Sequence, residues 1–200
     1  MPTDTKLKKE IELNILKYHL NPHFLYNYLN NLYSLSLSKS DKTPEMILLF
    51  SEVIRYINLS PTKPYVLLKE EIKIIKKLIT LFKVKFSKAV DITINIDNPK
   101  TAYEIEPMLL LPLVYNALIF SNVREDEGFI LINIINTENK FSFNIKYSHS
   151  KEPEQVSFDF DSTLIFENIK KRLFLKYENK SNIYHEEQEY LSEFTIIITK

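Results

Sequence analysis

The strongest chemical signal in this sequence is a histidine that directly follows a proline and precedes an asparagine by four residues. Residues 20–27 are LNPHFLYN, so His23 follows Pro22 directly and Asn27 comes one helical turn later. On a helix, the Asn27 amide can hydrogen-bond one imidazole nitrogen of His23 and leave the other nitrogen free as a nucleophile. The simpler alternative is a histidine on the surface or in the core of a helix bundle, and a lone histidine is more often of that kind. The local pattern alone leaves both interpretations open.

Two amphipathic helices are expected to carry this segment. Apolar residues recur at helical spacing from residue 5 to 38 and again from 43 to 59. Pro22 lies inside the first run and predicts a bend there, while Thr43 and Pro44 suit the N-cap and the first position of the second helix. A helical hairpin of this size buries too little alone, so we expect a homodimer in which two copies form a four-helix bundle.

A proline-containing break separates this hairpin from the rest of the chain. Residues 60–64 are SPTKP, which predicts a boundary between domains at 1–62 and 63–200. Beyond the break, periodicity predicts helices over 67–86, 106–122 and 162–177, and strands over 91–97, 129–135, 141–147, 182–186 and 193–199. We therefore predict an α+β protein, with the helical hairpin followed by an α/β sandwich whose helices cover one face of the sheet.

The composition excludes several classes of function. Lys plus Arg and Asp plus Glu both number 26, and this zero net charge argues against nucleic-acid binding. The absence of cysteine removes disulfides and thiolate metal sites. A single glycine, Gly128, cannot build a P-loop or a GxGxxG turn. The longest nearly apolar run, 108–120, is too short to span a membrane and no signal peptide opens the chain, so we expect a cytoplasmic protein.

Metal binding has little support in the sequence. His19 lies four residues before His23, which is a spacing that metal ligands use. The glutamate of an HExxH motif is missing, and two such histidines are more often surface groups than a zinc site. We expect no metal site.

Several segments resemble, in the same order, the motifs of the LytS-like sensor histidine kinases. The stretch around His23 is similar to the NPHFLFN signature that carries the phosphoacceptor histidine of that family. Further matches follow at 49–56 (the second dimerisation helix), 66–72 ("TLEEEL"), 81–97 ("KLRF" and the first strand), 107–117 ("PPLLLQPLVENA") and 168–173 ("NVRERL"). The resemblance covers nearly all of the chain.

The resemblance implies a fold and a reaction. It implies a hairpin that dimerises into a four-helix bundle, followed by a GHKL-type ATP-binding sandwich. In working members the sandwich transfers the ATP γ-phosphoryl group to the bundle histidine, here His23 with Asn27 to orient it, and a response-regulator aspartate then accepts it. Relatives usually carry membrane segments upstream of this region.

The nucleotide site departs from the family pattern at most of its positions. Asn116 is kept as one residual Mg-ATP position, but Tyr115 stands where the family has Glu. Tyr147 stands where the family has the Asp that recognises adenine, and Thr163 and Ile165 fall where it has glycines. A neutral phenol cannot replace a carboxylate in holding Mg²⁺. We therefore expect no cofactor, with ATP and Mg²⁺ binding lost.

Three hypotheses for function follow from these residues. The first is a two-component signalling protein with a phosphoacceptor His23 and a degenerate ATP site, acting as a phosphotransfer protein or as a pseudokinase partner. The second is an active sensor histidine kinase, and the third is a dimerisation module in which His23 is inert. The expected partners are a second copy of the chain and either a response regulator or an intact histidine kinase, without nucleic acid and without a membrane span in this chain.

Overall fold

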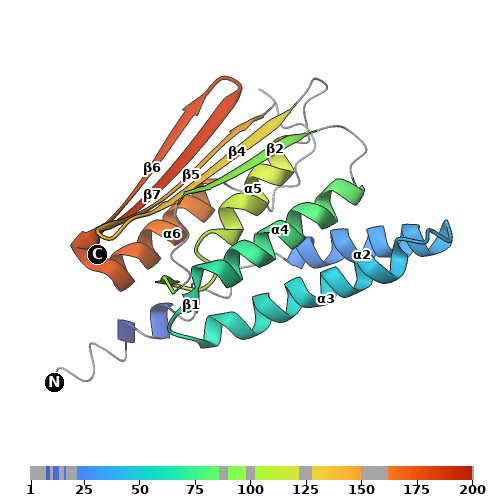
Figure 1. Ribbon diagram of the computed structural model, residues 1–200, viewed down its shortest axis with the longest axis horizontal. Helices are drawn as coiled ribbons and strands as arrows, with labels where there is room; N and C mark the ends of the chain where they lie inside the picture. The colour runs from blue at the N-terminus through green and yellow to red at the C-terminus, as the bar shows by residue number, and fades with distance from the viewer. Residues whose placement is uncertain are drawn as a thin grey trace.

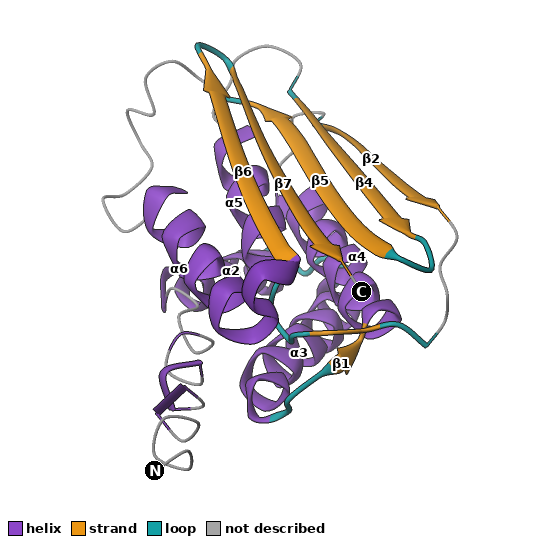
Figure 2. Ribbon diagram, turned by 90° about the vertical axis from the view of Figure 1, so that its left-hand side faces the viewer, coloured by secondary structure: helices purple, strands orange, loops and turns teal. Residues whose placement is uncertain are grey.

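Three layers of secondary structure stack on one another in the computed structural model (Figure 1). The structure describes residues 8–9, 11–13, 16, 22–85, 90–97, 102–121, 128–149 and 162–199. A five-stranded sheet forms one outer layer, and helices α4, α5 and α6 lie against one of its faces (Figure 2). Helices α2 and α3 form a hairpin on the side of α4 that is turned away from the sheet.

The helices agree closely with the periodicity of the sequence. The hairpin consists of α2 and α3, and the middle layer consists of α4, α5 and α6, with a 3₁₀ turn after α3 and another after α6. Their bounds are α2 Pro22–Leu37, α3 Thr43–Leu59, η1 Ser60–Thr62, α4 Leu68–Lys85, α5 Leu111–Ser121, α6 Ser162–Tyr177 and η2 Glu178–Lys180. No helix in the described part of the chain is both long and apolar enough to cross a membrane.

The main sheet has the strand order β2-β4-β5-β7-β6, in which β2 and β4 are parallel and the other pairs are antiparallel. Two short strands that the sequence did not predict, β1 and β3, pair beside α4. The strands are β1 Val66–Leu67, β2 Asp91–Asp97, β3 Glu104–Ile105, β4 Phe129–Asn136, β5 Lys140–Ser148, β6 Ser181–Gln188 and β7 Leu191–Thr199. Alternate residues of β4, β5 and β7 are buried under the helices, which confirms the predicted sandwich with one covered face.

The inner face of the hairpin is covered within the same chain. Met46, Phe50 and Val53 of α3 are buried in one core with residues of α4. The rings of Tyr28 in α2 and Phe50 stack with their centroids 5.9 Å apart. The inner face of the hairpin therefore needs no second copy to bury its apolar residues, because α4 covers it.

Three local details differ from the sequence prediction. Lys42, not Thr43, is the N-cap residue of α3, and the Thr43 hydroxyl instead donates to the Ser40 carbonyl at 2.8 Å. Helix α5 begins at Leu111 instead of 106, because Met108 has a positive φ of 61° that no α-helix accommodates. Helix α2 begins at Pro22, and the bend predicted just before it falls on residues outside the described part of the chain.

Candidate functional site

Asn116 and Tyr147 meet in the interior between α5 and β5. The Asn116 Nδ2 donates a hydrogen bond to the Tyr147 hydroxyl, with 3.1 Å between the two atoms. Asn116 is 0% exposed and Tyr147 is 2% exposed. Among the described residues, the Asn116 Oδ1 has no hydrogen-bond partner. The amide nitrogen of Asn116 is thus committed to the phenol, while its carbonyl oxygen keeps its capacity to accept.

Aromatic rings from three elements pack around this pair. The Tyr147 ring stacks on Phe194 of β7, with centroids 6.4 Å apart and planes 10° from parallel. Phe194 in turn stacks on His185 of β6 at 4.0 Å, and Phe166 of α6 contacts both rings at 6.2 and 5.7 Å. Side chains of α6, β6 and β7 therefore fill the space beside Tyr147.

A chain of polar groups continues from Tyr147 across the sheet. Ser192 lies opposite Tyr147 in the β5–β7 pairing, and its Oγ is 2.9 Å from the His185 Nε2. Burial raises the pKa of Tyr147 to about 12, with the charge of Glu187 adding to the rise and a hydrogen bond to Ser192 opposing it. Burial also lowers the pKa of His185. Both side chains are therefore uncharged near pH 7.

Tyr115 takes part in a different contact from its neighbour Asn116. It is buried, and its electrostatic influence on Tyr28 shows that it is close to α2. Burial and the nearby Tyr115 together raise the pKa of Tyr28. Because successive helical residues point about 100° apart, α5 presents Asn116 to the sheet and Tyr115 to the hairpin.

A buried carboxylate, which the sequence did not single out, joins the hairpin to α5. Glu71 of α4 is 0% exposed. Its Oε1 accepts the amides of Leu110 (2.7 Å) and Leu111 (3.2 Å), and its Oε2 accepts the amide of Met108 (3.1 Å) and the hydroxyl of Tyr56 (2.9 Å). Glu71 thereby caps the N-terminus of α5 from another helix. Burial raises the pKa of the Glu71 carboxyl, and these hydrogen bonds oppose that rise.

A buried arginine holds the same loop from the opposite side. Arg172 of α6 donates to the carbonyls of Pro107 (2.7 Å) and Met108 (2.8 Å), and its Nη2 is 3.4 Å from the Glu106 carboxylate. The Tyr177 hydroxyl accepts the amide of Glu106 at 2.8 Å. Helices α4 and α6 thus fix residues 106–110, the segment that leads into α5 and its Asn116.

The sequence contained a signal for Glu71. Glu71, Ile75, Leu78 and Phe82 follow one another at spacings of four, three and four residues, so Glu71 falls on the buried face of its helix. A carboxylate in such a row needs buried donors. The fold supplies them from residues 108–111, which no periodicity could have placed there.

Comparison with known proteins gives consistent matches. The histidine kinase family model matches residues 11–90. YwpD of Bacillus subtilis (strain 168) is 26% identical over 171 residues, which is 82% of this chain and 61% of YwpD. The sensor protein LytS of the same organism is 32% identical over 115 residues, which is 57% of this chain and 19% of LytS.

Solved histidine kinase structures have the same fold. The nucleotide-free catalytic domain of ThkA aligns with a TM-score of 0.52 and 20% identity, over 68% of this chain and 96% of that one. ThkA in complex with the response regulator TrrA aligns with a TM-score of 0.50 and 17% identity, over 89% of this chain and 59% of that one.

The residues matched by the family model include the His23 segment. The chain is similar to the LytS-like histidine kinases. It spans less than two thirds of the length of YwpD and about a fifth of LytS. The resemblance seen in the motifs is thereby confirmed, as is the α+β class.

The residues predicted for this histidine kinase homologue fall into two groups. His23 and Asn27 lie on α2, but their side chains are outside the described part of the structure, as is all of His19. Asn116 and Tyr147 are brought into direct contact. Thr163 and Ile165 lie in the first turn of α6, next to the Phe166 that packs on Phe194.

The single glycine has a packing role. A Cβ at Gly128 would lie 2.7 Å from the carbonyl oxygen of Ser121, the last residue of α5. Any larger residue would therefore push the start of β4 away from α5. Among the described residues, no group of three or more His, Asp or Glu is arranged to hold a metal ion.

Proposed function

We propose that this chain acts in two-component signalling as a phosphotransfer protein or pseudokinase partner. In this proposal His23 accepts the phosphoryl group, Asn27 orients the His23 imidazole, and the sandwich does not use ATP. The observation that carries the proposal is the buried hydrogen bond between Asn116 and Tyr147, which engages the one residual Mg-ATP position with a neutral phenol.

The chemistry of phosphoryl transfer supports the loss of ATP use. Transfer from ATP depends on positioning and on neutralising charge, mostly through Mg²⁺ held by carboxylate and amide oxygens. At the two positions where the family has carboxylates, this chain has Tyr115 and Tyr147, both buried. The pKa of Tyr147, near 12, keeps its phenol neutral at physiological pH. Phe166 and Phe194 add further bulk beside Tyr147.

The active-kinase alternative also has an observation in its favour. Asn116 is retained, and its Oδ1 is without a hydrogen-bond partner among the described residues, so the oxygen could still serve as a Mg²⁺ ligand. Calorimetry with Mg-ATP distinguishes the two. We expect no heat of binding at about 1 mM nucleotide, whereas a micromolar dissociation constant would favour the active kinase.

Phosphate acceptance tests the role of His23. The protein is incubated with labelled phosphoramidate, a small molecule that can donate its phosphoryl group to histidine. It is then incubated with labelled phosphorylated response regulators. We expect label that is acid-labile and base-stable, that is lost in His23→Gln and that persists in the matched control His19→Gln. Label that is absent, or that survives His23→Gln, would leave only the dimerisation module.

A homodimer through the outer face of the hairpin is part of the same proposal. Leu25, Leu29, Tyr33 and Leu37 recur every four residues along α2, and all four are at least 40% exposed. Such a stripe is typical of a helix that pairs with another helix. We expect light scattering to give a dimer that Leu29→Glu converts to a monomer. A wild-type monomer at high micromolar concentration would contradict the dimer.

The partner proposed for the phosphoryl group is a response regulator or an intact histidine kinase. ThkA, which shares the fold, has been solved with a response regulator bound. The cytoplasm is the compartment where such an exchange would take place.

A further inference from the structure

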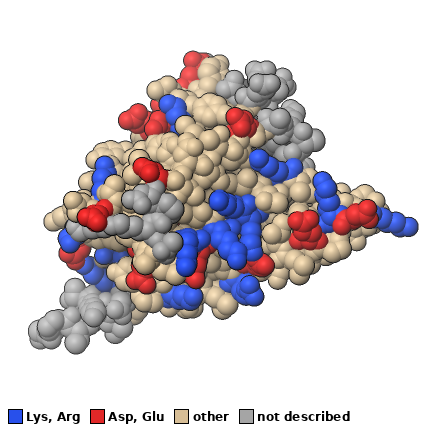
Figure 3. Space-filling view, viewed as in Figure 1, with Lys and Arg blue, Asp and Glu red and all other residues tan. Residues whose placement is uncertain are grey.

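A basic groove lies between helix α4 and the edge strand β2, away from Asn116 and His23. It encloses about 520 Å³ and is lined by Lys69, Lys73, Lys76, Lys77, Ile72, Thr80 and Ile96. Lys and Arg gather in the middle of this face of the molecule (Figure 3). Lys69, Lys73 and Lys76 are exposed, whereas Lys77 forms an ion pair with Glu52.

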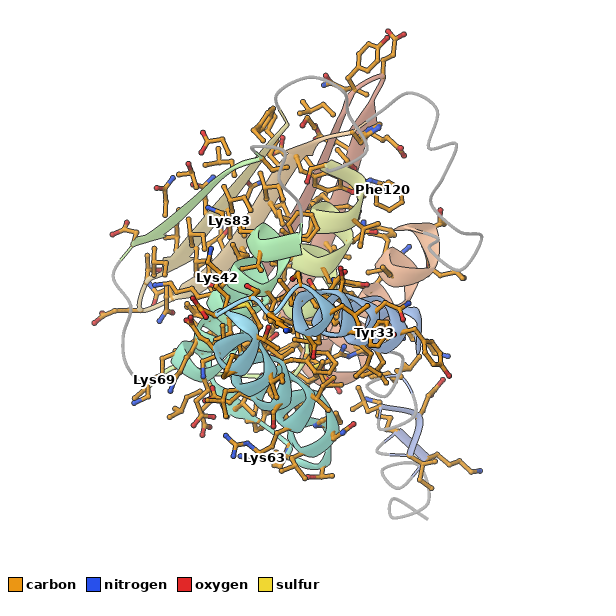
Figure 4. All side chains as sticks on the ribbon, turned by 90° about the vertical axis from the view of Figure 1, so that its right-hand side faces the viewer. Tyr33, Lys42, Lys63, Lys69, Lys83 and Phe120 are labelled. Carbon is orange, nitrogen blue, oxygen red and sulfur yellow. The ribbon has the colours of Figure 1, made fainter. Side chains whose placement is uncertain are left out.

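The lysines follow one side of a helix. Lys69, Lys73 and Lys76 are spaced by four and three residues, so they form a row along α4 that begins in its first turn. Figure 4 shows Lys69 near one end of α4 and Lys83 nearer the other. Ile72 of α4 and Ile96 of β2 provide apolar contacts beneath this row.

The groove meets the sheet at Ile96 of β2, which is an edge strand. β2 pairs with β4 only, so its second side has no strand partner among the described residues. The Asp91 amide donates to the Gly128 carbonyl on the β4 side at 2.9 Å. Because backbone groups of successive residues point to opposite sides of a strand, those of Ile92, Ile94 and Ile96 point to the open edge.

The side chains of β2 are also divided between two faces. Ile92, Ile94 and Ile96 face the helices and are only half-buried, whereas Asp91 and Asp97 at the two ends of the strand are exposed on the other face. A further strand beside β2 would cover the three isoleucines. Its side chains on the helix face would meet the α4 lysines, while acidic groups on the opposite face would be repelled by the two aspartates.

We propose that this groove binds an extended acidic segment of a partner protein, which adds to the sheet as a strand beside β2. Alternate residues of that segment carry carboxylates toward Lys69, Lys73 and Lys76, and its backbone pairs with Ile92, Ile94 and Ile96. Main-chain pairing supplies affinity in this mode of recognition, and the alternating side chains supply specificity. The surface does not depend on the proposed function of His23.

A polypeptide fits this groove better than a nucleic acid does. A phosphate backbone would meet the lysines, but it cannot form a ladder with the N–H and C=O groups of a strand edge.

Binding of a synthetic peptide tests the proposal. The probe is a fluorescent peptide as long as β2 that alternates Glu and Thr, with a peptide that alternates Lys and Thr as its counterpart. We expect anisotropy to show binding of the acidic peptide alone, with an affinity that falls as salt is added. Amide exchange measured by NMR should slow at Ile92, Ile94 and Ile96, whose amides face the open edge.

Two sets of variants separate the contributions of charge and strand edge. Lys73→Glu combined with Lys76→Glu should weaken binding about tenfold. The matched control, Lys140→Glu combined with Lys180→Glu, makes the same change in charge away from the groove and should have little effect. Ile94→Pro should abolish binding while preserving the fold, because a proline whose missing N–H faces outward is tolerated in an edge strand.

Several results would overturn the proposal. These are no binding at millimolar peptide, equal weakening by both lysine pairs, or binding that leaves the exchange of the three amides unchanged. Tighter binding of a single-stranded oligonucleotide than of the acidic peptide would also overturn it. If Ile94→Pro fails to fold, as judged from thermal melting, the lysine variants and the exchange data still decide the outcome.

Discussion

Replacing Glu71 with glutamine is expected to destabilise the protein by about 2–4 kcal/mol. The carboxylate accepts three backbone amides and one phenol while fully buried. Glutamine keeps one oxygen for Leu110 and Leu111 but turns an NH₂ group toward the Met108 amide, leaving that buried donor without an acceptor at a cost of about 1–3 kcal/mol. The remaining hydrogen bonds lose their charge, which removes about 1 kcal/mol from each. The lower cost of burying a neutral group offsets part of this loss.

Urea denaturation followed by far-UV circular dichroism measures this loss, at a fixed protein concentration because any dimerisation would contribute to stability. Glu70→Gln is the matched control, since Glu70 is the exposed neighbour on the same helix and should change the free energy of unfolding by less than about 0.5 kcal/mol. Amide exchange should accelerate at Met108, Leu110 and Leu111 in Glu71→Gln only. If the two variants were equally stable, the role of Glu71 as the cap of α5 would be refuted.

Three other substitutions test the packing around the site. Burial raises the pKa of Tyr147 to about 12, so its contribution to stability is complete below pH 10 and falls by about 2 kcal/mol by pH 12. The urea midpoint should therefore fall less over this pH range in Tyr147→Phe than in the wild type, and equal slopes would contradict this. Arg172→Lys should lower the free energy of unfolding in urea by about 3 kcal/mol, because one ammonium group cannot reach two carbonyls and the Glu106 carboxylate together. A loss below about 1 kcal/mol would argue against a structural role for these three contacts. Gly128→Ala should lower the free energy of unfolding by about 1–3 kcal/mol through its clash with the Ser121 carbonyl, whereas unchanged stability would show that β4 can move.

Local periodicity determined most of the secondary structure. Helix α6 has the predicted bounds of 162–177, and β2, β4 and β5 agree with the predictions to within one residue at each end, because their apolar residues repeat with one period throughout. Helix α5 was predicted too long because Met108, Leu109 and Leu110 continue its apolar run toward the N-terminus. Their conformation is set by Glu71 and Arg172, which are distant in sequence.

The resemblance to the LytS-like histidine kinases, and the departures from their nucleotide-site motifs, could likewise be recognised from residue types alone. A histidine after a proline, a tyrosine in place of an acid and a near absence of glycine are properties of the chain itself. What each replacement does depends on its neighbours in space. Only the tertiary structure decided that Asn116 bonds to Tyr147, because strand β5 brings residues 31 positions apart into contact.

The covering of the hairpin was also decided by tertiary structure. The sequence shows that α2 and α3 are amphipathic, but an apolar face does not specify which surface will bury it. The fold places α4 against their inner face and leaves the Leu25–Leu37 stripe outside. The open edge of β2 has the same origin, since strand order, and hence which strand lies at an edge, depends on pairing between distant segments.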